Sequence, residues 1–220
     1  MKLPFKKRTL VFLRAVVGFI VFYTALSALF YYSNPRITGW LMPVYTQIIM
    51  RAYPGNELIS IENTGQSITY SIKIKRYIKG ITIPLEDFLN SSIHSSFQFV
   101  TLIIYYSLLF AWPSFPLSKR IKAFLITLPI LVLFVCIDIP VTIISSIELD
   151  CLQKLHGIPM VDTFSRKVLL YLSHFFNNGG RQFFAVTLFA FTVIPFRLGS
   201  LSMKPVVEET KIARRHKIIN

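Results

Sequence analysis

The chain has 220 residues, of which 53% are hydrophobic and 15% charged, and its 24 Lys and Arg against 10 Asp and Glu give a formal charge of +14. Soluble domains average about 25% charged residues. Here the apolar residues gather in runs of about 20, the length that crosses a bilayer. The composition therefore indicates an integral membrane protein and excludes a soluble enzyme, a disordered chain and a disulfide scaffold.

Four apolar segments have the length, or nearly the length, that crosses a hydrocarbon core of roughly 30 Å at about 1.5 Å per residue. The first three run from Leu10 to Tyr32, from Ile93 to Trp112 and from Ala123 to Ile147. The fourth has a clean core from Gln182 to Phe196 and needs residues upstream, around Phe175 to Arg181, to reach full span. The pattern predicts a mainly α-helical fold with four transmembrane helices.

Basic residues alternate with these spans. Three segments together hold 14 Lys and Arg and two acids: the N-terminal segment, the loop from Pro113 to Lys122 and the tail from Arg197. Nine bases and seven acids lie in the other two loops, Ser33–Ser92 and Glu148–Lys167. Cytoplasmic loops carry the excess of Lys and Arg. We therefore expect an inner-membrane protein with both termini cytoplasmic. An anionic leaflet accounts for the net charge, so no nucleic-acid partner is expected.

The first span also has features of a secretory signal peptide, namely a basic start and the small residues Ala25, Ser27 and Ala28. Its apolar run is longer than the roughly 7–15 residues of a signal core, which favours a retained signal anchor over a cleaved peptide.

The chain then divides into 1–32 (N-terminus and first span), 33–92 (first outer loop), 93–147 (second and third spans with their basic loop), 148–181 (second outer loop and amphipathic helix), 182–198 (core of the fourth span) and 199–220 (basic tail).

The first outer loop predicts a helix and a small sheet. Trp40 to Met50 fits an interfacial helix with Trp40 and Tyr45 at headgroup level. Residues 68–75 alternate between apolar and polar side chains, residues 58–61 form a partner strand, and the Asn-Thr-Gly-Gln sequence at 63–66 is favourable for a hairpin turn. A third short strand is expected at Gly80 to Ile83. A lone hairpin is marginal in water, so the helix, the membrane surface or a partner protein must cover its apolar face.

The second outer loop leads into an amphipathic helix from Ser165 to Phe176, with Ser173, His174 and Asn177 on its polar side. The sequence Asn-Asn-Gly-Gly-Arg follows at residues 177–181. Glycine inside a helix costs about 1 kcal/mol relative to alanine. This segment is therefore the expected site of a bend from the surface into the membrane.

Two opposite charges lie inside the predicted spans at matching depths. Asp138 lies 16 residues after Lys122, and Arg181 lies 16 residues before Arg197, so each is about 24 Å from the cytoplasmic boundary if its helix is continuous. A carboxylate in a span is costly unless it is neutralised or paired. We expect Asp138 to pair with Arg181, with Gln98 and either Asn177 or Asn178 nearby.

Three interpretations of this pair remain open. It either fixes helix register only, as buried ion pairs often do, or belongs to a functional polar site. In the third interpretation the two residues do not touch, because Gly179-Gly180 end a surface helix and Arg181 extends to the headgroups.

The sequence contains none of four common catalytic or binding motifs, namely a phosphate loop, His-Glu-x-x-His, Gly-x-Ser-x-Gly and Cys-x-x-Cys. The histidines are scattered, so no metal or cofactor is expected. Cys136 lies in the third predicted span and Cys151 in the outer loop after it, a placement that argues against a disulfide.

Cys151 is the one nucleophile with suitable neighbours on the outer side, His156, His174 and Arg181. A Cys-His pair with an Arg to hold an oxyanion is the arrangement of acyl transfer or transpeptidation. The alternative, which we favour, is that Cys151 is an incidental loop residue and that no residue here is catalytic.

The four-span layout and the segment Phe176-Asn177-Asn178-Gly179-Gly180-Arg181 at the start of the last span resemble the small multi-span proteins associated with exosortases, bacterial enzymes that process C-terminal sorting signals. Exosortases themselves have more spans and a membrane-embedded Cys followed by Ser-Gly, whereas Cys151 is followed by Leu152-Gln153. The resemblance therefore implies an accessory partner and does not imply the enzyme.

Three functions remain under consideration. The leading hypothesis is a non-catalytic accessory subunit of an envelope protein-sorting, processing or export system, which sits in the bilayer beside a larger membrane protein. The second is a membrane-embedded cysteine transpeptidase or protease built on Cys151, His174 and Arg181. The third is a small transporter or channel subunit that uses Asp138.

Overall fold

The computed structural model describes residues 5–52, 57–73, 88–113, 115–154 and 163–202. These residues form a mainly helical protein with a small antiparallel sheet. In chain order the elements are α1 (Phe5–Ala52), β1 (Glu57–Asn63), β2 (Ser67–Lys73), β3 (Phe88–His94), the 3-10 helix η1 (Ser95–Phe99), α2 (Val100–Ala111), α3 (Leu117–Lys154), α4 (Thr163–Phe175), the π-helical turn η2 (Phe176–Gly180) and α5 (Arg181–Ser202).

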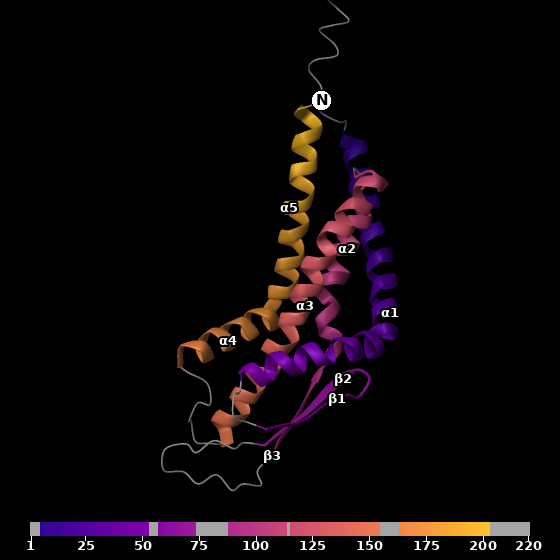
Figure 1. The fold of residues 1–220 in the computed structure, drawn as a ribbon. Helices are drawn as coiled ribbons and strands as arrows, with labels where there is room; N and C mark the ends of the chain where they lie inside the picture. Colours follow the sequence, from indigo (N-terminus) through magenta and orange to yellow (C-terminus); the bar gives the residue numbers. More distant parts are fainter. Residues whose placement is uncertain (1–4, 53–56, 74–87, 114, 155–162, 203–220) are drawn as a thin grey trace, which may run out of the picture.

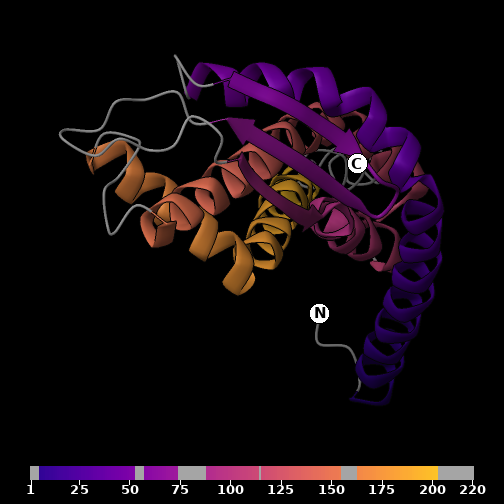
Figure 2. The ribbon, with the colours of Figure 1, turned by 90° about the horizontal axis from the view of Figure 1, so that it is seen from below.

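The long helices run roughly side by side. Figure 1 shows the first half of α1, α2, α3 and α5 as an elongated bundle, with the start of α1, the α2–α3 turn and the end of α5 at one end. The sheet, α4 and the second half of α1 lie at the opposite end (Figures 1 and 2). Two of the described helices are long and apolar enough to cross a membrane, over Thr9–Ala52 and Leu117–Asp150, and Ser95–Ala111 is a shorter apolar helix.

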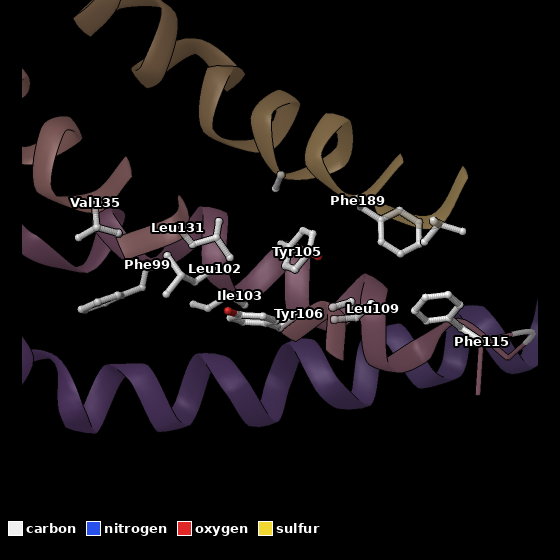
Figure 3. Packing of buried hydrophobic residues seen from close by; sticks show 13 residues of the cluster. Phe99, Leu102, Ile103, Tyr105, Tyr106, Leu109, Phe115, Leu131, Val135 and Phe189 are labelled. Atoms are coloured by element: carbon white, nitrogen blue, oxygen red, sulfur yellow. The ribbon is translucent and has the colours of Figure 1, made fainter. Parts of the chain in front are cut away.

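Aromatic and branched side chains fill the space between the helices of the bundle. Figure 3 shows Tyr105 and Leu109 of α2 between α5 on one side and α1 on the other. The cluster continues through Leu131 and Val135 of α3 to Phe189 of α5. At the α2–α3 turn, Arg120 donates to the carbonyl oxygens of Phe110, Trp112 and Phe115. These bonds satisfy acceptors that the end of α2 leaves without intrahelical donors.

Helix α1 combines two elements that the sequence predicts separately. The predicted span 10–32 and the predicted surface helix 40–50 belong to one helix, whose two halves run in different directions (Figure 1). Pro35 lies between them, and proline removes the backbone donor to the carbonyl four residues earlier, that of Tyr31. The side chain of Gln66 replaces the missing donor, with its Nε2 at 3.1 Å from that oxygen.

The predicted hairpin is confirmed. Strands β1 and β2 pair in antiparallel register, with Ile61 opposite Tyr70, and Gly65 in the connecting turn has φ of 89°, a conformation that glycine adopts without strain. The predicted strand Gly80 to Ile83 lies outside the described residues. The third strand of the sheet is β3, which pairs with β2.

Helix α1 covers the apolar face of the sheet, and the sequence alone left open whether this helix, the membrane surface or a partner protein does so. Ile68, Tyr70 and Ile72 of β2 pack against Tyr45 and Ile49 of α1, together with Ile139, Ile143 and Ile147 of α3. The placement of Tyr45 at headgroup level is therefore wrong, because its side chain is fully buried, whereas Trp40 is exposed. Tyr45 and Ile49 are one helical turn apart on the face of α1 that packs on the sheet, and burial of the tyrosine ring outweighs an interfacial position.

The predicted bounds of two other segments also change. The second span was expected to begin as a helix at Ile93, but Ile93 pairs with Ile68 in the sheet and the α-helix begins at Val100. Helix α3 continues to Lys154, so residues 148–154, including Cys151, are helical and do not form part of a loop. The helices predicted at 123–147, 165–176 and 182–196 are confirmed as helices within α3, α4 and α5.

Candidate functional site

The predicted pair of buried charges is present at the contact of α3 with α5. Arg181 is the first residue of α5, and its Nε and Nη2 donate to Asp138 Oδ2 and Oδ1 at 2.7 and 2.8 Å. Asp138 is 0% exposed and Arg181 5% exposed. The two parallel hydrogen bonds form a fork, the geometry that fixes both the distance and the orientation of the two groups.

The remaining N–H groups of Arg181 also have acceptors. Nη1 donates to Asn177 Oδ1 at 3.1 Å and to the carbonyl oxygen of Phe176 at 3.4 Å, and Nη2 donates to Thr142 Oγ1 at 3.4 Å. A guanidinium carries five N–H donors. All five are therefore used within the protein, and the acceptors that hold the charge of Arg181 belong to α3 and η2.

The Asn-Asn-Gly-Gly-Arg segment builds the joint that brings Arg181 to Asp138. Gly179 has φ of 103°, where a side chain is strained, and a Cβ on Gly180 would collide with the ring and carbonyl oxygen of Phe175. The predicted bend therefore exists, and α5 runs unbroken from Arg181, as the depth calculation assumed. Thr101 of α2 holds the same point by donating to the carbonyl oxygen of Arg181 at 3.3 Å.

Only part of the predicted surroundings of the pair is correct. Asn177 contacts Arg181, but Asn178 is exposed and donates to the carbonyl oxygen of His174. Gln98 was expected nearby; it is fully buried in η1, which lies against α3. Its Nε2 donates to Asn34 Oδ1 and Thr38 Oγ1 at 3.0 and 2.6 Å. These hydrogen bonds of Gln98 therefore join it to α1 and not to the charged pair.

Gln98 belongs to a second buried network, which joins α1 to the sheet and η1. Tyr45 donates to Gln98 Oε1 at 2.7 Å, and Asn34 Nδ2 donates to Ser95 Oγ at 2.7 Å and to Gln66 Oε1 at 2.9 Å. Asn34 and Thr38 were not predicted from the sequence to have this role. Asn34 directly precedes Pro35 within an apolar helix, and that pair of residues was the available signal.

A cleft lies between the C-terminal part of α3 and α4, next to the charged pair. Its volume is about 470 Å³, and its walls are Ser145, Leu149, Leu170, Tyr171, Ser173, His174 and Asn177. Asn177 is common to the cleft and to the hydrogen bonds of Arg181. The cleft is thus adjacent to the pair through Asn177, and it presents hydroxyl, imidazole and amide groups.

The residues of the cysteine hypothesis are only partly placed. His174 is exposed and lines the cleft, and Arg181 is committed to Asp138. The side chain of Cys151 and the whole of His156 lie outside the described residues. Within the described part of the chain, no group of three His, Cys, Asp or Glu side chains is arranged to hold a metal ion.

The Asp138–Arg181 salt bridge joins α3, η2 and α5 at one point. Comparisons with protein-family models, with curated proteins and with solved structures find no match. The resemblance to exosortase-associated proteins therefore stays a prediction.

Proposed function

We propose that this protein is a four-span membrane protein and a non-catalytic accessory subunit of an envelope protein-sorting, processing or export system. The membrane part of the proposal is supported by large apolar side chains that are more than half exposed along the bundle. They are Leu13, Val17, Ile20, Val21 and Leu29 of α1, Leu125, Ile126 and Leu133 of α3, and Phe183, Val186, Phe191 and Ile194 of α5. Soluble monomers rarely expose apolar patches larger than a few hundred Å², so lipid is the solvent that this surface fits.

The positions of the charges support an orientation with both termini in the cytoplasm. The start of α1 with its lysines, the α2–α3 turn with Lys119 and Arg120, and the end of α5 lie at the same end of the bundle (Figure 1). The sheet and α4 occupy the other end, where the flanking loops have nearly balanced charge. By the positive-inside rule the first end faces the cytoplasm, which places the sheet and the cleft outside.

The accessory role is supported mainly by the complete hydrogen bonding of Arg181. A transported ion or a reacting group would have to displace partners that already use every N–H group of the guanidinium, which also bonds to each carboxylate oxygen of Asp138. A fixed pair instead keeps α4 and α5 at a constant angle to α3. It thereby holds a stable outer surface, composed of the sheet and the α3–α4 cleft, for a larger membrane protein to recognise.

Cysteine accessibility tests the membrane orientation. In a background in which Cys136 and Cys151 are replaced by Ser, cysteines at Thr64, an exposed turn residue, and at Ser118, an exposed residue in the first turn of α3, form a matched pair. We expect a membrane-impermeant thiol reagent added to intact cells to label position 64 and to label position 118 only after lysis. Labelling at 118 in intact cells would place the basic turn outside and refute the orientation.

Site-specific crosslinking tests the accessory role. A photoreactive residue at Ser71, on the outward face of β2, should capture one larger membrane protein in intact cells. The same residue at Phe191, on the lipid-facing side of α5, serves as the control and should not capture it. If neither position captures a protein while purified chains alone show a turnover or a transport activity, the accessory proposal is wrong.

A further inference from the structure

Helix α4 carries an apolar surface that remains largely exposed in the described part of the chain. Phe164 and Tyr171 are 76% and 73% exposed, and Val168, Leu172 and Phe175 are also exposed. At 100° per residue these five side chains fall within an arc of about 100°, the width of an ordinary apolar stripe. The helix is amphipathic as predicted, but its main apolar stripe points out of the protein.

A different face of α4 attaches the helix to the protein. Leu169 packs against the apolar cluster formed by α1, β2 and α3, and Ser173 and Phe176 are buried. His174 lies on the other flank of the stripe, where it lines the cleft with α3, and Tyr171, at the edge of the stripe, borders the same cleft. The exposed stripe is therefore additional to the surfaces that fold the chain, and its burial must come from the surroundings.

The stripe is continuous with the lipid-facing surface of α5. The rings of Phe175 in α4 and Phe183 in α5 are in contact across the bend, with centroids 6.3 Å apart in an edge-to-face arrangement. Both rings are exposed. Figure 1 shows α4 turning away from the axis of α5 at the end of the bundle that carries the sheet. A bilayer that surrounds α5 would therefore meet the stripe of α4 at its outer boundary.

Charge favours the same environment. Residues 163–175 contain Arg166, Lys167 and His174 and no acid, and Lys167 is exposed on the flank of the stripe. A helix with an apolar stripe and basic residues beside it binds at the interface of membranes that contain anionic lipids. Trp40 is exposed in the second half of α1, at the same end of the bundle, and tryptophan is enriched at this depth.

We propose that α4 lies in the plane of the outer leaflet, with Phe164, Val168 and Tyr171 inserted at the boundary of headgroups and acyl chains and the basic flank on anionic phospholipid headgroups. This inference rests on the proposed function, since it requires α5 to span the bilayer. The surface is a lipid-binding site of the protein, and it fixes the height of the α3–α4 cleft relative to the membrane. A ligand or partner that enters the cleft would then do so at headgroup level.

Fluorescence in vesicles tests the proposal. Single cysteines at Val168, Tyr171 and His174 of the full chain, in the background without native cysteines, would carry an environment-sensitive dye. The proteins would be reconstituted in vesicles of phosphatidylethanolamine and phosphatidylglycerol. Nitroxide placed near the top of the acyl chains should quench the dye at 168 and 171 several-fold more than at 174. An aqueous quencher should show the opposite order.

Two control positions separate this inference from the proposed function. A dye at Phe191 of α5 reports whether α5 is in the bilayer, and a dye at Thr64 reports water. If 191 is quenched by lipid nitroxide but 168 and 171 are quenched from water, α4 lies off the membrane and the inference is wrong, although the spanning model stands. If 191 is quenched from water, the spanning model itself fails. Protection of 168 and 171 from both quenchers would mean that protein covers the stripe, which also overturns the inference.

Discussion

Removal of either charge from the Asp138–Arg181 pair should destabilise the protein strongly. Arg181→Ala deletes all five hydrogen bonds of the guanidinium and leaves a fully buried carboxylate without its cation. Asp138→Ala leaves the guanidinium with Asn177, Phe176 and Thr142 as neutral acceptors but without a counter-charge. Breaking a buried pair in this way costs about 3–5 kcal/mol. We expect both single variants to lie in that range, with Arg181→Ala the more damaging.

The double variant distinguishes a pair from two independent polar residues. If the two residues acted independently, the losses would add to about 6–10 kcal/mol by the same range. If each charge is needed only because the other is present, Asp138→Ala/Arg181→Ala should cost no more than either single variant, since no uncompensated charge remains. Asn177→Ala serves as a graded control, because it removes one hydrogen bond to a charged group, worth about 1.5–3 kcal/mol.

The free energy of unfolding in mixed micelles, measured by titration with denaturing detergent and followed by tryptophan fluorescence, provides the assay. Gel filtration before the titration confirms that each variant starts folded. Additive losses in the double variant would refute the reasoning, as would single variants within about 1 kcal/mol of the wild type, which is the cost of an ordinary neutral hydrogen bond.

Three further substitutions test other parts of the structure. Gly180→Ala should destabilise by several kcal/mol, about 1–3 for the overpacking alone, because the new Cβ meets the ring and backbone of Phe175. Asn178→Ala, an exposed position in the same turn, is the control. Equal unfolding temperatures for the two variants would contradict the joint as described. Gln66→Ala should cost about 1–3 kcal/mol in the same unfolding assay, because it removes the donor to the carbonyl oxygen of Tyr31, which Pro35 leaves without a backbone donor. Thr64→Ala, at an exposed position, is the control and should have little effect by comparison. Cys151→Ala should leave the crosslink to the partner and protein abundance unchanged, whereas loss of function at normal abundance would favour the cysteine-enzyme hypothesis.

The amino-acid sequence alone was sufficient to predict features that depend on local chemistry. Helical segments followed from runs of apolar residues, the hairpin from period-two alternation around Asn63 and Gly65, and the bend from the two glycines before Arg181. The ion pair was also predictable, because Asp138 is the only acid inside the predicted spans and helix rise places Arg181, but not Arg14 near the start of the first span, at its depth. A buried charge has few permitted partners, so its chemistry limits the alternatives.

The tertiary structure decided which neutral groups meet and where elements begin. Gln98 has the calculated depth of the charged pair, but its side chain bonds to Asn34 and Thr38. A neutral amide is satisfied by any nearby donor or acceptor. Depth along a helix does not specify which neighbouring helix a side chain faces. Ile93 fits a membrane helix or a strand equally well by composition, and only its pairing with Ile68 places it in the sheet. Tyr45 likewise became a core residue because α1 crosses over the sheet. Rise and periodicity are local properties of one helix, whereas partner choice depends on the azimuth of each helix and on contacts between residues distant in the chain.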